Sequence, residues 1–353
     1  MRVVVTGGAG FVGSSVALDL VRRHPDWEVV VADSLFRRGS ELNLPRLKEA
    51  GVEFVHADVR HPEDLARVGD FTALVECSAE PSVMAAVQGE GDFVVNTNLM
   101  GAYHCLDLAA RQQAQVIFLS TSRVYPVAGL EQLRTTEQDT RFVLDDDQPV
   151  PGAGAEGISE DFPLRGARTL YGATKLAGEL FCEEYAETFG LPIVVNRCGV
   201  IAGPWQMGKV DQGVFTHWLL SHYTGRDLRY IGYGGTGKQV RDLLHIDDLL
   251  DLIDDQLLRP QHWAGHTFNV GGGRAGSLSL AETTALCAEI TGRSVSVTPA
   301  GESRPGDVRV YLTDARAVRA HGGWAPQRTP RDVLTDIFTW VSENERLVLG
   351  ALG

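Results

Sequence analysis

Runs of apolar, largely β-branched residues alternate with stretches of helical periodicity along the first part of the chain. The apolar runs cover residues 2–6, 28–33, 52–58, 72–77 and 116–120, and a long helical pattern covers residues 96–112. Strands that alternate with helices in this way form a parallel sheet with right-handed crossovers. The pattern therefore predicts an α/β fold, a Rossmann-type doubly wound parallel sheet, whose switch point lies between the first and fourth strands.

The pattern changes in the remaining sequence. Residues 126–169 are rich in Pro, Gly and acidic residues and are predicted to form a long insert, either functional or disordered. Helical periodicity returns at 171–189, a buried strand follows at 192–197, and short helices and strands then alternate irregularly. We therefore predict two domains: 1–200, which includes the insert, and 201–353, a smaller lobe with some chain crossing back to the sheet.

The turn after the first apolar run contains glycines at a spacing typical of dinucleotide sites. Gly7, Gly10 and Gly13 are expected to allow a tight turn, the close approach of a pyrophosphate and close packing of the next helix. Asp33 ends the second run 20 residues after Gly13, where a carboxylate binds a ribose 2′-hydroxyl. These residues predict NAD as the cofactor, and an ordinary strand-to-helix turn is the alternative.

Charge and composition exclude several partners. The formal net charge is -14, which disfavours nucleic acid, and no apolar run reaches the roughly 18 residues of a membrane-spanning helix. The five cysteines are scattered without a Cys-x-x-Cys pair, as expected for reduced thiols. The first strand begins at residue 2, which leaves no room for a signal peptide. We predict a cytoplasmic protein without nucleic-acid, membrane or metal partners.

Arg37 and Arg38 could neutralise a 2′-phosphate, so the preference for NAD over NADP depends on Asp33.

The segment Tyr171-Gly-Ala-Thr-Lys175 places a phenol and an ammonium one helical turn apart on the same face. A free tyrosine has a pKa of about 10, and a nearby lysine helps it to act as a base near neutral pH. Taken alone, such a pair is more often a half-buried aromatic residue beside a surface lysine. Here the hydroxyls of Thr121 and Ser122 also follow a strand end, where sites form in doubly wound sheets.

With these three features together, the chain resembles the extended short-chain dehydrogenase/reductases that act on nucleotide sugars, the NAD-dependent sugar-nucleotide epimerase/dehydratase family. Further marks of that family are the segments 237–249, 268–272 and 304–307, and the resemblance covers nearly the whole length. It implies that Thr121, Tyr171 and Lys175 are the catalytic residues. It also implies a nucleotide-diphosphate sugar as substrate and a homodimer that pairs through the helices at 96–112 and 171–189.

The resemblance implies two sets of binding residues. Those implied for NAD are Gly7, Gly10, Phe11, Val12, Gly13, Asp33, Ser34, Asp58, Val59, Ser78, Ala79, Asn98, Tyr171 and Lys175. Those implied for the sugar nucleotide are Glu80, Ser122, Arg123, Arg241, Arg304 and Asp307. The guanidinium groups of Arg241 and Arg304 suit a diphosphate or a ribose. Judged without the family resemblance, an arginine at either position is more often a surface residue.

Two departures from the family pattern narrow the choice among the reactions that its members catalyse. Relatives that remove water carry Thr-Asp-Glu after the fifth strand, whereas this chain has Thr121-Ser122-Arg123, which disfavours dehydration. Many 4-epimerases carry an asparagine where Val200 lies here. The sub-family with the most similar motifs is the CDP-paratose (CDP-tyvelose) 2-epimerases, in segments 37–44, 81–83, 211–213 and 237–242.

The predicted reaction is therefore epimerisation of a nucleotide-activated sugar, best assigned to C2 of a CDP-hexose or CDP-deoxyhexose. The sugar would be oxidised transiently to a keto sugar, and the hydride would return to its opposite face. A UDP-sugar 4-epimerase and a nucleotide-sugar decarboxylase or reductase are alternatives on the same scaffold. A non-catalytic dinucleotide sensor is disfavoured, because it would be free to lose Thr121, Tyr171 and Lys175.

Overall fold

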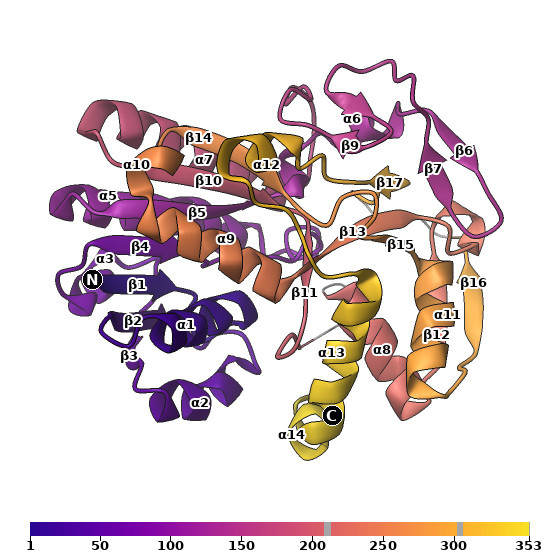
Figure 1. Cartoon of the computed structure of the whole chain (residues 1–353), viewed down its shortest axis with the longest axis horizontal. Helices are drawn as coiled ribbons and strands as arrows, with labels where there is room; N and C mark the ends of the chain where they lie inside the picture. Colours follow the sequence, from indigo (N-terminus) through magenta and orange to yellow (C-terminus); the bar gives the residue numbers. More distant parts are fainter. Residues whose placement is uncertain (208–212, 302–305, 353) are drawn as a thin grey trace. The chain divides into compact units, whose positions relative to one another are not determined.

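The computed structural model describes residues 1–207, 213–301 and 306–352 of the chain (Figure 1). These residues form two compact units, each assembled from separate segments of the chain. The first unit comprises residues 1–121, 170–197 and 249–267, and the second comprises 122–169, 198–248 and the described part of 268–353. Among the described residues, no helix is both long enough and apolar enough to cross a membrane.

The first unit is built on a seven-stranded sheet. In sheet order its strands are β14 (His266–Val270), β10 (Ile193–Cys198), β5 (Gln115–Thr121), β4 (Ala73–Glu76), β1 (Arg2–Thr6), β2 (Glu28–Asp33) and β3 (Glu53–His56). Strand β1 runs parallel to both of its neighbours, and Val3 pairs with Val29 of β2 and with Ala73 of β4. The valines of β1 are at most 1% exposed, as expected for a sheet covered on both faces. The predicted Rossmann-type fold, with its switch point between β1 and β4, is confirmed.

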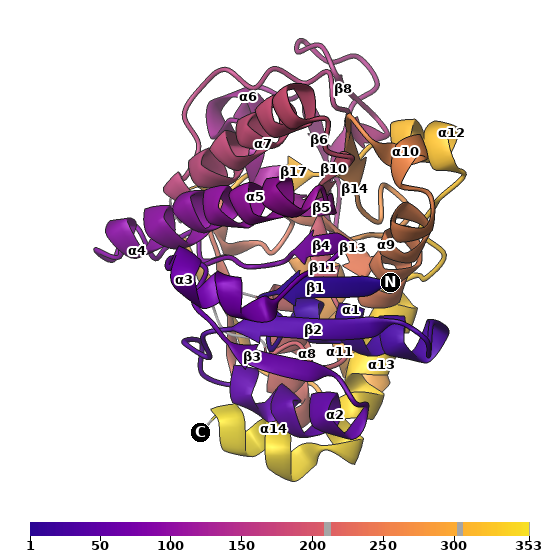
Figure 2. The same ribbon diagram turned by 90° about the vertical axis from the view of Figure 1, so that its left-hand side faces the viewer.

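Helices cover both faces of this sheet (Figure 2). They are α1 (Phe11–Arg23), η1 (Ser40–Asn43), α2 (Leu44–Glu49), α3 (Pro62–Leu65), η2 (Ala66–Val68), α4 (Gly91–Val95), the π-helical turn η3 (Asn96–Met100), α5 (Gly101–Gln112), α7 (Leu170–Phe189), α9 (Ile246–Leu258) and α10 (Pro260–Trp263). Helices α5 and α7 lie side by side on one face, where Tyr103 contacts Phe181. Helices α1 and α9 lie on the other face, where Arg23 forms ion pairs with Asp251 and Asp254.

The second unit has a small mixed sheet and a separate apolar core. Strand β13 (Val240–His245) pairs with β11 (Val200–Ala202), β15 (Ser277–Ser279) and β17 (Val310–Tyr311). Helices α8 (Val214–Thr224), α11 (Leu280–Thr291) and α13 (Pro330–Glu343) supply core residues such as Phe215, Cys287 and Ile337. The other elements are η4 (Ser122–Val124), α6 (Val127–Glu131), β6 (Thr135–Glu137), β7 (Phe142–Leu144), β8 (Ala153–Gly154), β9 (Gly157–Ile158), β12 (Leu228–Ile231), η5 (Tyr233–Gly235), β16 (Val297–Ala300), α12 (Arg316–Gly322) and α14 (Glu345–Leu352).

The insert at 126–169 differs from the sequence prediction in two respects. It lies in the second unit rather than in the first, because backbone hydrogen bonds join Phe142 N–H to Lys238 O and Ile158 N–H to Leu312 O. It also contains helix α6 and the hairpins β6–β7 and β8–β9, so it is not an irregular loop throughout. The return of the chain to the first sheet is made by α9, α10 and β14.

Candidate active site

The glycine turn between β1 and α1 has the geometry of an anion site. Gly7 has a φ of 61°, and the Gly10 N–H donates to the Gly7 carbonyl at 3.0 Å. A Cβ on Gly13 would lie 2.3 Å from the Gly7 carbonyl oxygen, so only glycine allows α1 to pack this closely. Among the described residues, no side chain caps the start of α1 at Gly10, so the N–H groups of the first turn, with Phe11 and Val12, are available to a phosphate.

Asp33 lies at the end of β2, beside this turn. Its carboxylate accepts hydrogen bonds from the N–H of Ala9 at 3.0 Å and from the N–H of Leu35 at 2.8 Å. Burial raises the pKa of Asp33, and these backbone hydrogen bonds oppose the shift. The next residue, Ser34, has its carbonyl oxygen 3.1 Å from Nε2 of His56. The predicted ribose-binding carboxylate is therefore fixed against the glycine turn.

Asp58 and Val59 follow β3 and already have partners within the protein. Arg60 Nη2 donates to Asp58 Oδ2 at 2.5 Å. Burial raises the pKa of Asp58, but the hydrogen bonds from Arg60 outweigh it and leave that pKa below its ordinary value. A Cβ on Gly101 would lie 2.6 Å from a methyl group of Val59, so Val59 packs tightly on the start of α5. Their predicted contact with NAD stays a prediction.

Asn98 fixes the loop that follows β4. Its Oδ1 accepts from the N–H of Glu80 at 2.7 Å, and its Nδ2 donates to Glu80 O at 3.1 Å and to Thr174 Oγ1 at 3.3 Å. Asn98 is 1% exposed and lies in η3, an irregularity that is frequent at functional sites. It therefore ties the segment that contains Ser78 and Ala79 to α7, and its amide hydrogens are used within the protein.

The three predicted catalytic residues lie in the first unit. Thr121 ends β5 and is 8% exposed, and α7, which packs on β5, carries half-buried Tyr171 and buried Lys175 one turn apart. Lys175 Nζ lies 3.2 Å from Glu76 Oε2 and 4.0 Å from the centroid of the Phe118 ring. Burial disfavours the ammonium, yet Glu76 and Tyr171 raise the pKa of Lys175 above its ordinary value. Lys175 is therefore charged at neutral pH and is coupled electrostatically to Tyr171.

Glu76 is a residue of this cluster that the sequence reasoning missed. It is the last residue of β4 and is 2% exposed. Burial raises the pKa of Glu76, and Lys175 opposes the shift. The signal in the sequence was a carboxylate at the end of an otherwise apolar run. Its partner Lys175 is 99 positions away, so no local pattern reveals the pair.

The residues predicted to bind the sugar nucleotide divide between the two units. Glu80 is in the first unit, where its Oε1 accepts from the N–H of Ser82 at 2.9 Å. Ser122, Arg123, Arg241 and Asp307 are in the second unit. Arg304 lies outside the described residues, as does most of the segment 211–213.

Two of the predicted arginines converge on one short segment of the second unit. Arg241 Nη2 donates to Asp307 Oδ1 and to Val308 O, both at 2.6 Å. Arg123 Nη1 donates to Gly306 O at 2.7 Å. The structure therefore brings Arg123, Arg241 and Asp307 together around residues 306–308, with Asp307 as the counter-ion of Arg241.

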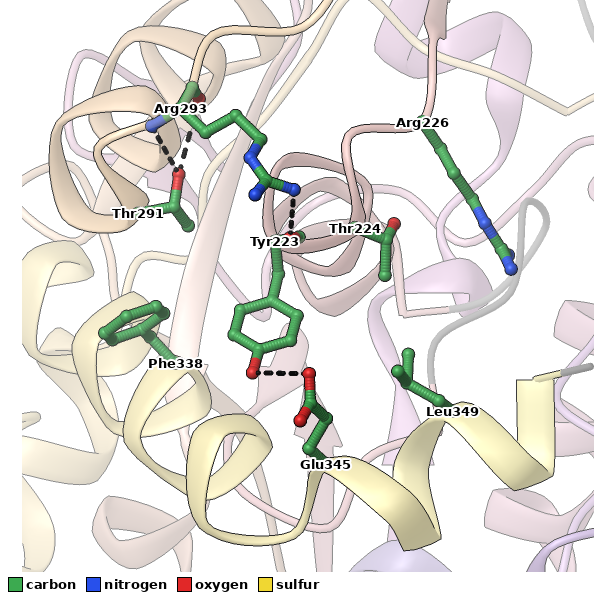
Figure 3. Close-up of a pocket in the computed structure, with 8 residues that line it drawn as sticks. All are labelled: Tyr223, Thr224, Arg226, Thr291, Arg293, Phe338, Glu345 and Leu349. Carbon is green, nitrogen blue, oxygen red and sulfur yellow. Dashed lines mark hydrogen bonds between the residues drawn. The ribbon is translucent and has the colours of Figure 1, made fainter.

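A pocket of the second unit is lined by none of the predicted residues that the structure describes (Figure 3). It is lined by Tyr223, Thr224, Arg226, Thr291, Arg293, Phe338, Glu345 and Leu349. Arg293 donates to the Tyr223 carbonyl at 2.8 Å, and the Tyr223 hydroxyl donates to Glu345 at 3.2 Å. These polar groups therefore satisfy one another, and we assign the pocket no role in catalysis.

Comparison with known proteins places this fold and site in a family. Residues 3–271 match the model of the NAD dependent epimerase/dehydratase family, and the chain belongs to that family. Its predicted assignment to the NAD-dependent sugar-nucleotide epimerases is confirmed at the level of the family, and NAD is its cofactor. The glycine turn, the uncapped start of α1 and Asp33 fit that cofactor.

Three relatives illustrate the similarity. The CDP-paratose 2-epimerase of Salmonella typhi is 30% identical over 355 residues, which cover 97% of this chain and 99% of that protein. The dTDP-glucose 4,6-dehydratase of Streptomyces niveus is 28% identical and covers 98% of this chain and 94% of its own length. The crystal structure of UDP-glucuronic acid 4-epimerase from Bacillus cereus, in complex with UDP-glucuronic acid and NAD, superposes with a TM-score of 0.78 at 22% identity. That superposition covers 97% of this chain and 99% of the neighbour.

Proposed function

We propose that this enzyme inverts C2 of a CDP-linked hexose or deoxyhexose and keeps its NAD through each cycle. The observation that carries the proposal is the 30% identity to a CDP-paratose 2-epimerase over nearly the full length of both chains. Dehydration is disfavoured, because Ser122 and Arg123 follow Thr121 where dehydrating relatives carry two acids. Arg123 is moreover a guanidinium that stays protonated, so it supplies neither the acid nor the base of such a pair.

The roles of the catalytic residues follow from their chemistry. The Tyr171 phenolate takes the proton of the sugar hydroxyl as the carbinol is oxidised, and the phenol so formed gives the proton back when the ketone is reduced. Lys175 is charged and favours the phenolate form of Tyr171, since opposite charges lower the pKa of an acid. The Thr121 hydroxyl at the end of β5 donates to the reacting oxygen. NAD supplies a hydride acceptor that returns the hydride to the same sugar.

Isotope labelling tests the reaction directly. A CDP-hexose deuterated at C2 is incubated with the enzyme in ordinary water, and the product is examined by NMR and mass spectrometry. The proposal requires inversion at C2 with the deuterium retained, because the hydrogen leaves and returns within one active site. Loss of the label to solvent would point to enolisation instead. Inversion at C4 of a UDP-sugar, with CDP-sugars inert, would establish the alternative 4-epimerase.

We also propose that the enzyme is a homodimer. Large apolar side chains are exposed on α5 and α7, including Tyr103 at 36%, Leu180 at 57% and Phe189 at 48%. These two helices lie side by side, so the exposed side chains can form one apolar surface. Light scattering of the purified enzyme is expected to give twice the chain mass. Leu180→Asp should yield monomers, and a monomeric wild-type enzyme would refute the proposal.

A further inference from the structure

The ion pair between Glu76 and Lys175 lies at the centre of the predicted catalytic cluster, although the mechanism above does not use Glu76. Both side chains are 2% exposed, and Nζ is 3.2 Å from the carboxylate. Glu76 also accepts a hydrogen bond from the backbone N–H of Ser78, in the loop that follows β4. A single carboxylate therefore holds the lysine of α7 and the start of this loop.

Within the part of the chain that the structure describes, few other ionisable groups face the pair. From α5, Cys105 faces it, and from α7, Tyr171 and Cys182 face it. Burial raises the pKa of both cysteines, so they remain neutral thiols at physiological pH. One turn further along α7, Glu179 is paired with Arg197 on β10. Glu76 is therefore the principal negative charge acting on the Lys175 ammonium.

We propose that Glu76 is a positioning residue that fixes the charge and place of Lys175 and thereby sets the acidity of Tyr171. A buried ammonium without a partner would lose its proton or move toward solvent. With Glu76 the ammonium stays charged in one place, held between the carboxylate and the Phe118 ring. The ammonium held in this way favours the Tyr171 phenolate, so Glu76 acts on Tyr171 through Lys175.

This inference rests on the proposed role of Tyr171, but its test needs no substrate. The variant Glu76→Gln keeps the size and polarity of the side chain and removes its charge. The pKa of Lys175, one of four lysines in the sequence, is read from side-chain nitrogen NMR of the enzyme as purified. The pKa of Tyr171 is read from tyrosinate absorbance, as the difference between each protein and the same protein carrying Tyr171→Phe.

We expect Glu76→Gln to lower the pKa of Lys175 by about 1–3 units, since a negative charge is lost, and to raise the pKa of Tyr171, since a neutral or displaced Lys175 no longer favours the phenolate. Asp19→Asn is the matched control. Asp19 is also a buried carboxylate in an ion pair, with Arg23, but it lies on α1 at the opposite face of the sheet. Asp19→Asn should leave both pKa values at their wild-type positions.

Folded Glu76→Gln with unchanged pKa values for Lys175 and Tyr171 would overturn the proposal. Equal shifts in Asp19→Asn would overturn it too, since they would reflect a general loss of packing. If Glu76→Gln fails to fold, Glu76→Asp provides the test. It keeps the charge, but its side chain is one methylene shorter, so the carboxylate lies farther from Lys175 Nζ. Its Lys175 pKa should lie below the wild-type value, and an unchanged value refutes the proposal. Failure of the proposed C2 epimerisation would leave these pKa shifts in place, so the two failures are distinguishable.

Discussion

Glu179 on α7 and Arg197 on β10 form an ion pair that is almost completely removed from solvent. Arg197 Nη2 lies 2.8 Å from Glu179 Oε2, and Nε lies 3.1 Å from each carboxylate oxygen. The exposed fractions of the two side chains are 7% for Arg197 and 2% for Glu179. The pair joins helix and sheet at the centre of the first unit.

We predict that Glu179→Ala lowers the free energy of unfolding by about 3–5 kcal/mol, because it removes the carboxylate that compensates the buried charge of Arg197. Urea denaturation followed by circular dichroism measures the change. The double variant Glu179→Leu with Arg197→Met should recover most of the loss, since well-packed apolar residues often replace a buried pair without cost. A loss below about 1 kcal/mol in Glu179→Ala would mean that water reaches Arg197.

Gly13→Ala is expected to abolish cofactor retention. The added methyl would lie 2.3 Å from the Gly7 carbonyl oxygen, which is backbone and has little freedom to move. The start of α1 would shift and misplace the N–H groups that receive the pyrophosphate. NAD released from the denatured protein should fall at least about tenfold relative to wild type. Gly154→Ala is the control, because its added methyl group would meet no described residue beyond its chain neighbours within 4 Å.

Tyr171→Phe is expected to reduce turnover by about 10²–10⁴ while leaving NAD bound, because general acid–base groups typically contribute that much. The substitution keeps the ring that packs at the start of α7 and removes only the ionisable oxygen. Tyr185→Phe on the same helix provides a matched control and should retain full turnover. Turnover at the wild-type rate in Tyr171→Phe would show that another group moves the proton.

Asp242 predicts a dependence of stability on pH. Its side chain is fully buried, and Oδ2 accepts from the N–H groups of Gly273 at 3.0 Å and Thr313 at 3.3 Å. Burial raises the pKa of Asp242, and these hydrogen bonds oppose the shift without reversing it. The folded-state pKa thus exceeds the unfolded value of about 3.9, so ionisation of Asp242 costs stability as the pH rises through the folded-state pKa.

Asp242→Asn removes this titration. Its free energy of unfolding, relative to wild type, should therefore move in favour of the variant as the pH is raised from below about 3.9 toward neutrality. Urea denaturation at a series of pH values measures the difference. Parallel pH curves for the two proteins would show that Asp242 titrates equally in the folded and unfolded states.

The sequence was most informative where a structural signal is local. Continuous apolar runs predicted β1 and β2 within a residue, and helical periodicity predicted the bounds of α7 within a residue. The insert was harder to predict, because hairpins as short as β8–β9 have too few residues for a period of two to be visible. Its place in the second unit depends on hydrogen bonds to Lys238 and Leu312, far along the chain.

In the candidate site, too, local motifs could be predicted from the sequence and contacts between distant segments could not. The glycine spacing and the Tyr-x-x-x-Lys segment are short motifs, and the sequence alone identified them. Glu76 depends on a partner in α7, and the hydrogen bonds of Asn98 to Glu80 and Thr174 also join segments that lie far apart in the chain. Charge pairing between distant segments is set by the tertiary fold, so it carries no signature in the local sequence.

The discontinuity of the first unit has a consequence for protein synthesis. Strand β10 leaves the ribosome well before β14, its neighbour in the sheet, is translated. During that interval the nascent chain carries an unpaired strand edge, which is a template for pairing with other chains. A gene fragment that stops near residue 200 would keep this edge open permanently and is expected to yield aggregated protein. The nascent enzyme is accordingly expected to engage chaperones until residue 270 has emerged.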